Sequence, residues 1–164
     1  ACMPLYFLLA AALVAVDQVV KYLVRAGIPL HTAVDFLPGL DLTYVQNTGA
    51  AFSMFSQHTW ILALISLIMS VVLAVALWKN FFTHPLGKVT LALLLAGAVG
   101  NLIDRTLRGF VVDMFQLLFM NFAVFNVADI CVVVGGIAAA AYYLLLADKL
   151  EHKEAPHGTA DADR

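Results

Sequence analysis

The sequence predicts an all-α membrane protein with four transmembrane helices, and three observations support this fold class. Hydrophobic residues make up 63% of the 164-residue chain and charged residues only 12%, whereas soluble domains average about 45–50% apolar and about 25% charged residues. Four segments are long and apolar enough to cross a hydrocarbon layer of about 30 Å, which takes about 20 helical residues. In three of them the polar residues gather near one end. We therefore expect much of the surface to face lipid.

The four predicted spans differ in where they carry charge. The first has charged residues only toward its C-terminal end, and the second has none between its two tryptophans. The third is uncharged from Val89 to Ile103, and the fourth ends in an uncharged run from Ile130 to Ala147. The spans are expected at residues 4–24, 59–78, 88–107 and 122–147.

The connections between the spans are unequal in length and character. Residues 25–58 form a long loop in which LDLTYV, residues 40–45, alternates apolar and polar side chains and predicts a short strand. Residues 108–121 are mostly apolar and are expected to lie at the membrane interface. We expect residues 1–149 to form one domain and residues 150–164 to be a polar, disordered tail.

The polar residues of the spans are expected to form one pocket. They lie toward the C-terminal ends of the first and third spans and the N-terminal end of the fourth, and successive helices alternate in direction. All three groups therefore meet at the same side, which the 25–58 loop also covers. The opposite side carries five of the nine Lys and Arg residues, which weakly favours a pocket outside the cell and termini in the cytoplasm. The residues expected to form the pocket are Asp17, Lys21, Arg25, Asn101, Asp104, Arg105, Arg108, Asn126 and Asp129.

Two aspartates in apolar surroundings are the strongest catalytic candidates. Asp129 is expected about seven residues inside the fourth span, roughly 10 Å below its start, and no cation lies within a turn of it. Asp113 lies just upstream, where the alternative is a carboxylate among lipid headgroups. Two nearby carboxylates share a proton because both cannot ionise easily. Such a pair can hydrolyse a peptide bond by general acid–base catalysis.

Three neighbouring motifs have structural alternatives. Asp17 and Lys21 are four residues apart on one helix face, so they form either an ion pair or part of the site. Gly97 and Gly100 favour close packing of another helix over a role in the site. Asn47 precedes Thr48-Gly49, and from spacing alone an ordinary turn is favoured over substrate binding.

Other chemistries find little support. The five histidines are scattered, two cysteines form no zinc pattern, and neither H-E-x-x-H nor G-x-S-x-G occurs. We therefore expect no metal and no cofactor. The net charge of −2 is too small to indicate a nucleic-acid partner.

Five ordered motifs give the chain a resemblance to a known family. They are DQVVK (17–21), NTGAAF (47–52), GNLIDR (100–105), GFVVD (109–113) and FNVAD (125–129). Together with four spans and this length, they closely resemble bacterial lipoprotein signal peptidase, or signal peptidase II. The resemblance extends from Met3 to about Lys149.

The resemblance implies a membrane aspartyl endopeptidase that cleaves prolipoprotein signal peptides just before a diacylglyceryl-modified cysteine. It implies Asp113 and Asp129 as the catalytic dyad and a small extracytoplasmic β-cradle over residues 28–56. The enzyme would be a multi-pass protein of the bacterial cytoplasmic (inner) membrane, with its active site at the extracytoplasmic face. Its partners would be lipidated prolipoproteins and membrane lipid, and we expect a monomer. The surrounding substrate-binding or site-shell residues would be Asp17, Lys21, Asn47, Gly49, Asn101, Asp104, Arg105 and Asn126.

Rival functions fit less well. A proton-coupled transporter using Asp17, Asp104 and Asp129 predicts polar residues along the whole membrane depth, but the far ends of three spans are uncharged. A purely structural partner needs no aspartate pair. Another type of intramembrane aspartyl protease predicts a G-x-G-D motif, which is absent.

Overall fold

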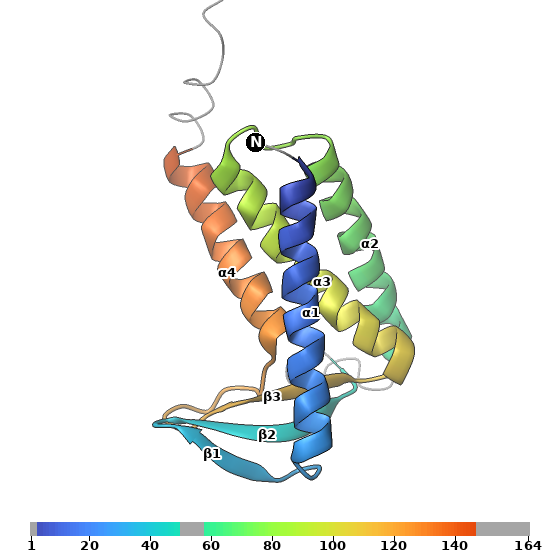
Figure 1. Cartoon of the computed structure of the whole chain (residues 1–164), viewed down its shortest axis with the longest axis vertical. Helices are drawn as coiled ribbons and strands as arrows, with labels where there is room; N and C mark the ends of the chain where they lie inside the picture. The colour runs from blue at the N-terminus through green and yellow to red at the C-terminus, as the bar shows by residue number, and fades with distance from the viewer. Residues whose placement is uncertain (1–2, 50–57, 147–164) are drawn as a thin grey trace, which may run out of the picture.

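The computed structural model describes residues 3–49 and 58–146. Within these residues, four helices are long and apolar enough to cross a membrane (Figure 1). This confirms the prediction of four spans. The helices are α1 (Met3–Gly27), α2 (Thr59–Trp78), α3 (Pro85–Arg108) and α4 (Val127–Ala141), and α4 continues into a short π-helix, η2 (Tyr142–Leu146).

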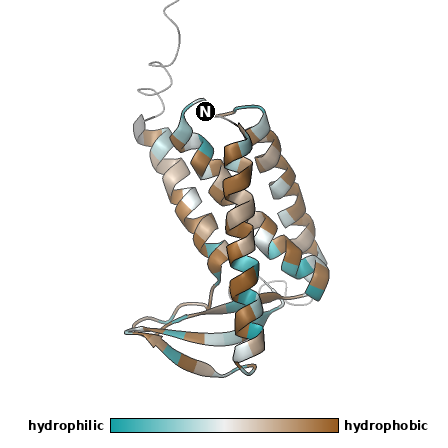
Figure 2. Ribbon diagram, viewed as in Figure 1, coloured by the Kyte–Doolittle hydropathy of each residue, from teal (hydrophilic) through white to brown (hydrophobic). Residues whose placement is uncertain are grey.

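Helix α3 is the centre of the bundle and packs against α1, α2 and α4. More than half of its apolar window is buried (56%), against 17% in α1, 17% in α2 and 22% in the fourth span. The outer faces of α1, α2 and α4 therefore carry exposed apolar side chains along their lengths (Figure 2). Such faces match a lipid environment rather than water.

Close contact between α3 and α4 depends on glycine. A Cβ atom on Gly97 would lie 2.6 Å from the carbonyl oxygen of Ala128 and 2.4 Å from a methyl carbon of Val132. A Cβ on Gly100 would lie 2.7 Å from a carboxylate oxygen of Asp17. The two glycines are packing positions, as the sequence favoured, and they bring α1 and α4 close to α3.

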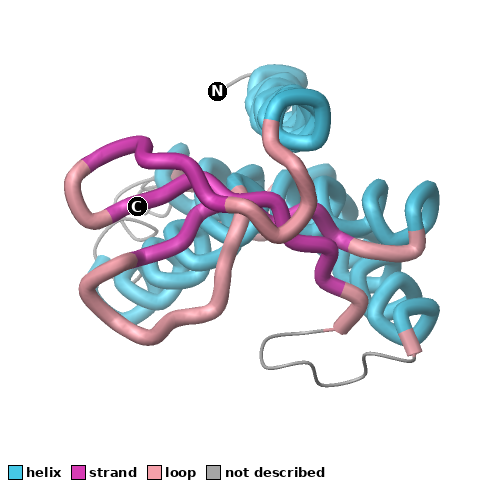
Figure 3. The backbone as a smooth tube through the Cα atoms, turned by 90° about the horizontal axis from the view of Figure 1, so that it is seen from below, coloured by secondary structure: helices cyan, strands magenta, loops and turns pink. Residues whose placement is uncertain are grey.

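A three-stranded antiparallel sheet lies across one end of the bundle (Figures 1 and 3). Its strands are β1 (Ala33–Leu37), β2 (Leu40–Asn47) and β3 (Val111–Leu117), in that order. The predicted strand at residues 40–45 is confirmed as part of β2. Residues 50–56 of the expected 28–56 cradle lie outside the described residues, as does the 150–164 tail.

One expectation about the region before α4 is wrong, and one strand there was not predicted. Residues 111–117 form strand β3, and because Val111, Val112, Asp113 and Met114 are all buried, the sequence has no alternation that would mark a strand. The fourth helix begins at Val127 rather than 122. Asp129 therefore lies in the first helical turn, not two turns inside the helix.

Candidate active site

The two candidate aspartates reach one pocket from different elements. Asp113 lies on β3, where it is the register partner of Val45 on β2, and Asp129 lies in the first turn of α4. Both line a pocket of about 510 Å³. Of the other predicted site residues, Asn47, Gly49, Asn101 and Arg105 line it too.

A capping box fixes Asp129 at the start of α4. The side-chain oxygen of Asn126 accepts a hydrogen bond of 2.9 Å from the Asp129 backbone N–H. In return, Oδ2 of Asp129 accepts a 3.2 Å hydrogen bond from the Asn126 backbone N–H. This reciprocal pair satisfies two backbone donors of the helix start. The positive end of the helix also favours a negative charge at this position.

A chain of amides joins the two carboxylates. Asn126 Nδ2 donates to Asp113 Oδ1 at 2.7 Å and to Asn101 Oδ1 at 3.2 Å. Asn101 Nδ2 then donates to Asp129 Oδ1 at 2.9 Å. The side-chain carbonyl of Asn101 also accepts from Lys21, which has only donors, so the amide has one orientation. The two aspartates are thereby held in one hydrogen-bonded network.

Asn47 donates the second hydrogen bond to the carboxylate of Asp113. Its Nδ2 donates to Asp113 Oδ2 at 3.0 Å, and its Oδ1 accepts from the Gly49 backbone N–H at 2.9 Å. The turn that the sequence favoured is present, and the same side chain also contacts Asp113; substrate binding by Asn47 stays a prediction. The Asn47 amide is directed at an aspartate, and each oxygen of both carboxylates accepts one hydrogen bond from the described residues.

Burial has the largest effect on the pKa of Asp113 and raises it. Its side chain is 2% exposed, and loss of solvent raises its pKa to about 7, with the charge of Asp129 acting in the same direction. Hydrogen bonds from Asn47 and Asn126 and the charge of Lys21 oppose this rise. Among residues 3–49 and 58–146, no Lys, Arg or His forms an ion pair with Asp113 or Asp129.

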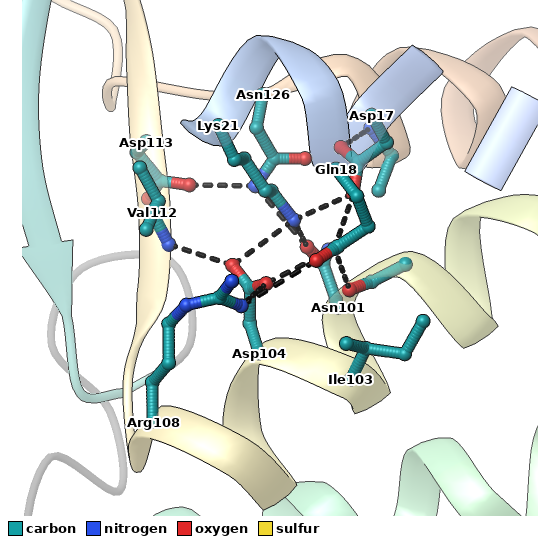
Figure 4. A network of polar contacts seen from close by, with 12 residues as sticks. Asp17, Gln18, Lys21, Asn101, Ile103, Asp104, Arg108, Val112, Asp113 and Asn126 are labelled. Atoms are coloured by element: carbon teal, nitrogen blue, oxygen red, sulfur yellow. Dashed lines mark hydrogen bonds and ion pairs between the residues drawn. The ribbon is translucent and has the colours of Figure 1, made fainter. Parts of the chain in front are cut away.

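A cluster of charged side chains lies next to the pocket and contacts it through Asn101 (Figure 4). Lys21 Nζ lies 2.8 Å from Asp17 Oδ2 and 3.1 Å from Asp104 Oδ2. Asp104 Oδ1 also pairs with Arg108 at 2.7 Å. The predicted pair of Asp17 and Lys21 is present, and it lies next to the site. None of these four residues lines the pocket.

Arg105 forms no ion pair with a carboxylate among the described residues. Its Nη1 donates to Ser66 Oγ on α2 at 3.1 Å, while the residue lines the pocket. Ser66 was not among the predicted site residues. A lone serine in an apolar span gives no signal of its own, because its contact depends on how α2 packs beside α3.

Gln18 is a second residue that sequence reasoning missed. Its Nε2 donates to Asp104 Oδ1 at 3.1 Å and to the Gly100 carbonyl at 3.2 Å. Its position next to Asp17, inside a membrane span, could have identified it as a candidate site residue. An uncharged amide in a span needs hydrogen-bond partners as much as a charge does.

The remaining wall of the pocket is apolar. It was not predicted, because apolar residues inside apolar segments give no distinguishing pattern. No three His, Cys, Asp or Glu side chains in the described part of the chain form a group that could hold a metal ion. The wall includes Leu117, Phe122, Phe125, Ile130 and Val133.

Comparison with known proteins identifies relatives over most of the chain. The family model described as signal peptidase (SPase) II matches residues 9–145. The lipoprotein signal peptidase of Enterococcus faecalis is 45% identical over 155 residues, covering 94% of this chain and 95% of that protein. That of Lactiplantibacillus plantarum is 43% identical over 132 residues, covering 80% and 88%. A bacterial membrane enzyme solved by the in meso method at 2.3 Å resolution superposes with a TM-score of 0.79 at 29% identity, covering 98% of this chain and 95% of the other.

Proposed function

The chain belongs to the signal peptidase II family, and from this premise we propose that it removes signal peptides from prolipoproteins with Asp113 and Asp129 as its catalytic dyad. One observation carries the assignment of the dyad. Two carboxylates from separate elements line the same pocket and are joined through Asn126 and Asn101. No other pair of carboxylates among the described residues lines this pocket.

The dyad supplies both proton transfers that peptide hydrolysis needs. The ionised carboxyl takes a proton from water as the water oxygen attacks the scissile carbonyl carbon, and the protonated carboxyl gives its proton to the carbonyl oxygen. The tetrahedral intermediate then collapses, the C–N bond breaks, and the amine leaves with a proton from the dyad. Each carboxylate oxygen accepts one hydrogen bond from the described residues and keeps a lone pair for water or substrate.

The titration of Asp113 suits this role. With a pKa of about 7, its protonated and ionised forms are both populated near neutral pH. The amide donors Asn47 and Asn126 lower the pKa of Asp113 only in part, whereas a cation in contact would favour the ionised form more strongly. The hydrogen bonds from Asn47 and Asn126 therefore position Asp113 without removing its ability to hold a proton.

The two-sided pocket suits a lipid-modified substrate. Its polar floor holds the dyad, and its apolar wall includes Ile130 and Val133 of α4. Val133 is 57% exposed on the outer face of that helix, so the wall is continuous with the surface that faces lipid. Acyl chains of a diacylglyceryl cysteine can stay in the bilayer while the peptide bond reaches the dyad. This anchoring reduces the entropy lost on alignment.

The remaining assignments concern the setting of the enzyme. We place the chain in the bacterial inner membrane, with the sheet and the dyad at the extracytoplasmic face and one copy as the active unit. Strand β3 and the first turn of α4, which carry the dyad, lie at the sheet end of the bundle, and α1 begins at the other end (Figure 1).

The test is cleavage of one prolipoprotein in lipidated and unlipidated forms by the purified full-length protein. We expect the lipidated form to lose its signal peptide, and the mature product to begin with the modified cysteine, as read by mass spectrometry. The unlipidated form should be cleaved at least tenfold more slowly. Equal rates would contradict the role of the lipid, and no cleavage of either form would contradict the proposed function.

A further inference from the structure

Each dyad aspartate follows a residue whose backbone N–H is bound by a buried carboxylate from another element. Asp17 Oδ1, on α1, accepts a 2.9 Å hydrogen bond from the N–H of Ala128, the residue before Asp129. Asp104 Oδ2, on α3, accepts a 2.9 Å hydrogen bond from the N–H of Val112, the residue before Asp113. The same kind of contact therefore holds the backbone next to both catalytic groups.

One ammonium group links these two contacts. Lys21 Nζ lies 2.8 Å from Asp17 and 3.1 Å from Asp104, and it donates to Asn101 Oδ1 at 3.0 Å. An ammonium has three N–H donors, and these three partners use all of them. The third partner, Asn101, donates to Asp129. Figure 4 shows Lys21 between Asp17, Asp104 and Asn101.

We propose that Lys21, with Asp17 and Asp104, is a positioning cluster that fixes the two dyad carboxylates relative to each other without touching substrate. The inference rests on the proposed function of the dyad. Lys21 is 0% exposed and does not line the pocket, so a direct role in substrate binding is excluded by its place. It acts through the strand β3 and the first turn of α4.

Repulsion explains why the cation is needed. Without Lys21, Asp17 and Asp104 are two buried carboxylates with like charge, and only Asp104 keeps a cation, Arg108. As the two side chains move apart, each pulls on the backbone next to one dyad residue. A shift on the order of 1 Å in a catalytic group costs about 10²-fold in rate. The positive charge of Lys21 thus holds Asp17 and Asp104 together, and this keeps the two dyad carboxylates in fixed relative positions.

The variant Lys21→Met tests the inference by separating kcat from KM. We expect kcat to fall about 10- to 100-fold, while KM for the lipidated substrate stays within about threefold. The pH profile should also move to higher pH, because the positive charge of Lys21 opposes the raised pKa of Asp113. The charged groups around Lys21 are Asp17 on α1, Asp104, Arg105 and Arg108 on α3, Asp113 on β3 and Asp129 on α4.

A double variant tests whether repulsion is the cause. Lys21→Met with Asp17→Asn returns the net charge of Asp17, Lys21, Asp104 and Arg108 to zero, and the asparagine carbonyl can still accept from Ala128. Because the repulsion is removed and both backbone contacts remain, we expect kcat to recover with the melting temperature, while the pH profile stays displaced because the positive charge of Lys21 is still absent. A kcat that stays as low as in Lys21→Met despite recovered stability would overturn the inference, as would a rise in KM with kcat unchanged.

A matched control is Lys88→Met. Like Lys21, Lys88 is a buried lysine, but it lies on α3. It is 6% exposed, and its ammonium lies 5.9 Å from the ring centre of Tyr6. Its removal should leave the pH profile and kcat unchanged. If Asp113→Asn and Asp129→Asn remain active, the proposed dyad fails, and the inference fails with it. If they are inactive but the Lys21 variants have normal kcat and pH profile, only the positioning inference fails.

Discussion

At the scale of single residues, amide side chains donate hydrogen bonds to the two proposed catalytic carboxylates, and Lys21 reaches them only through Asn101. Asn47, Asn101 and Asn126 donate to the dyad, while Lys21 donates to Asn101 and to two other aspartates. A cation in direct contact would stabilise the ionised form and hinder proton exchange. A neutral amide also favours the ionised form, but less strongly than a cation does, and it offsets part of the desolvation cost.

Burial of Asp113 predicts how stability depends on pH. Its pKa is about 7 in the folded protein and about 3.9 in an unfolded chain. The folded state therefore holds the proton more tightly, so the stabilisation is complete below about pH 4 and is lost progressively as pH rises to about 7. The loss is on the order of a few kcal/mol.

The variant Asp113→Asn removes this titration. In detergent, the melting temperature of the unmodified protein should fall more steeply between pH 4.5 and 7.5 than that of the variant. Melting curves across this range, for both proteins, measure the difference. Parallel dependences on pH would show that Asp113 ionises normally in the folded state.

The sequence predicted the site residues better than their contacts. Carboxylates and amides in apolar segments are conspicuous because an unpaired polar group is costly there. Their partners depend on how distant elements pack. The Asp17 carboxylate binds the N–H of Ala128, 111 residues away, and no local pattern predicts such a contact. For the same reason, the direct bond from Asn47 to Asp113 was not predicted.

At the scale of elements, the helices were predictable and one strand was not. A span needs about 20 apolar residues, and that requirement marks a long helix clearly. Strand β3 is short, and its first four residues are all buried, so it lacks the alternation that identified β2. The start of α4 was misplaced because residues 122–125 are apolar yet lie before the Asn126 cap.

The contact of α3 with α4 predicts unequal effects of two glycine substitutions. A Cβ on Gly97 meets the Ala128 carbonyl at 2.6 Å, and backbone atoms move only with difficulty. Gly97→Ala should therefore destabilise the protein by about 1–3 kcal/mol. It should also lower activity, because Ala128 adjoins Asp129.

Gly136→Ala is the matched control. No atom of the described residues lies within 4 Å of a Cβ at that position, and alanine favours a helix over glycine by about 1 kcal/mol. Its melting temperature should be equal to or above that of the unmodified protein. Equal effects of the two substitutions would contradict the close packing of α3 on α4.

At the scale of the whole molecule, the sheet and the dyad lie at one end of a bundle whose sides face lipid. The N-terminus and the α2–α3 turn lie at the other end (Figure 1). If that end is cytoplasmic, the dyad meets substrates at the outer leaflet, where a lipid-anchored cysteine would be held. The charge bias of the sequence favours this direction only weakly, so the direction needs a direct measurement.

Cysteine labelling in intact cells measures the direction of insertion. In a background without Cys2 and Cys131, Asp35→Cys on the exposed strand β1 should react with a membrane-impermeant maleimide. Thr83→Cys in the α2–α3 turn, also exposed, should react only after the membrane is opened. The reverse pattern would place the dyad at the cytoplasmic face and contradict the account of substrate access.

The most direct test of the dyad is turnover of a lipidated prolipoprotein by Asp113→Asn, Asp129→Asn and the double variant, each with a melting curve. Asparagine preserves size but cannot exchange the proton, so each single variant should lose at least about 10²–10⁴-fold in rate while staying folded. The double variant should lose no more than either single one, because the two groups act as a unit. Near-normal turnover by a folded Asp129→Asn or Asp113→Asn variant would contradict the aspartyl mechanism.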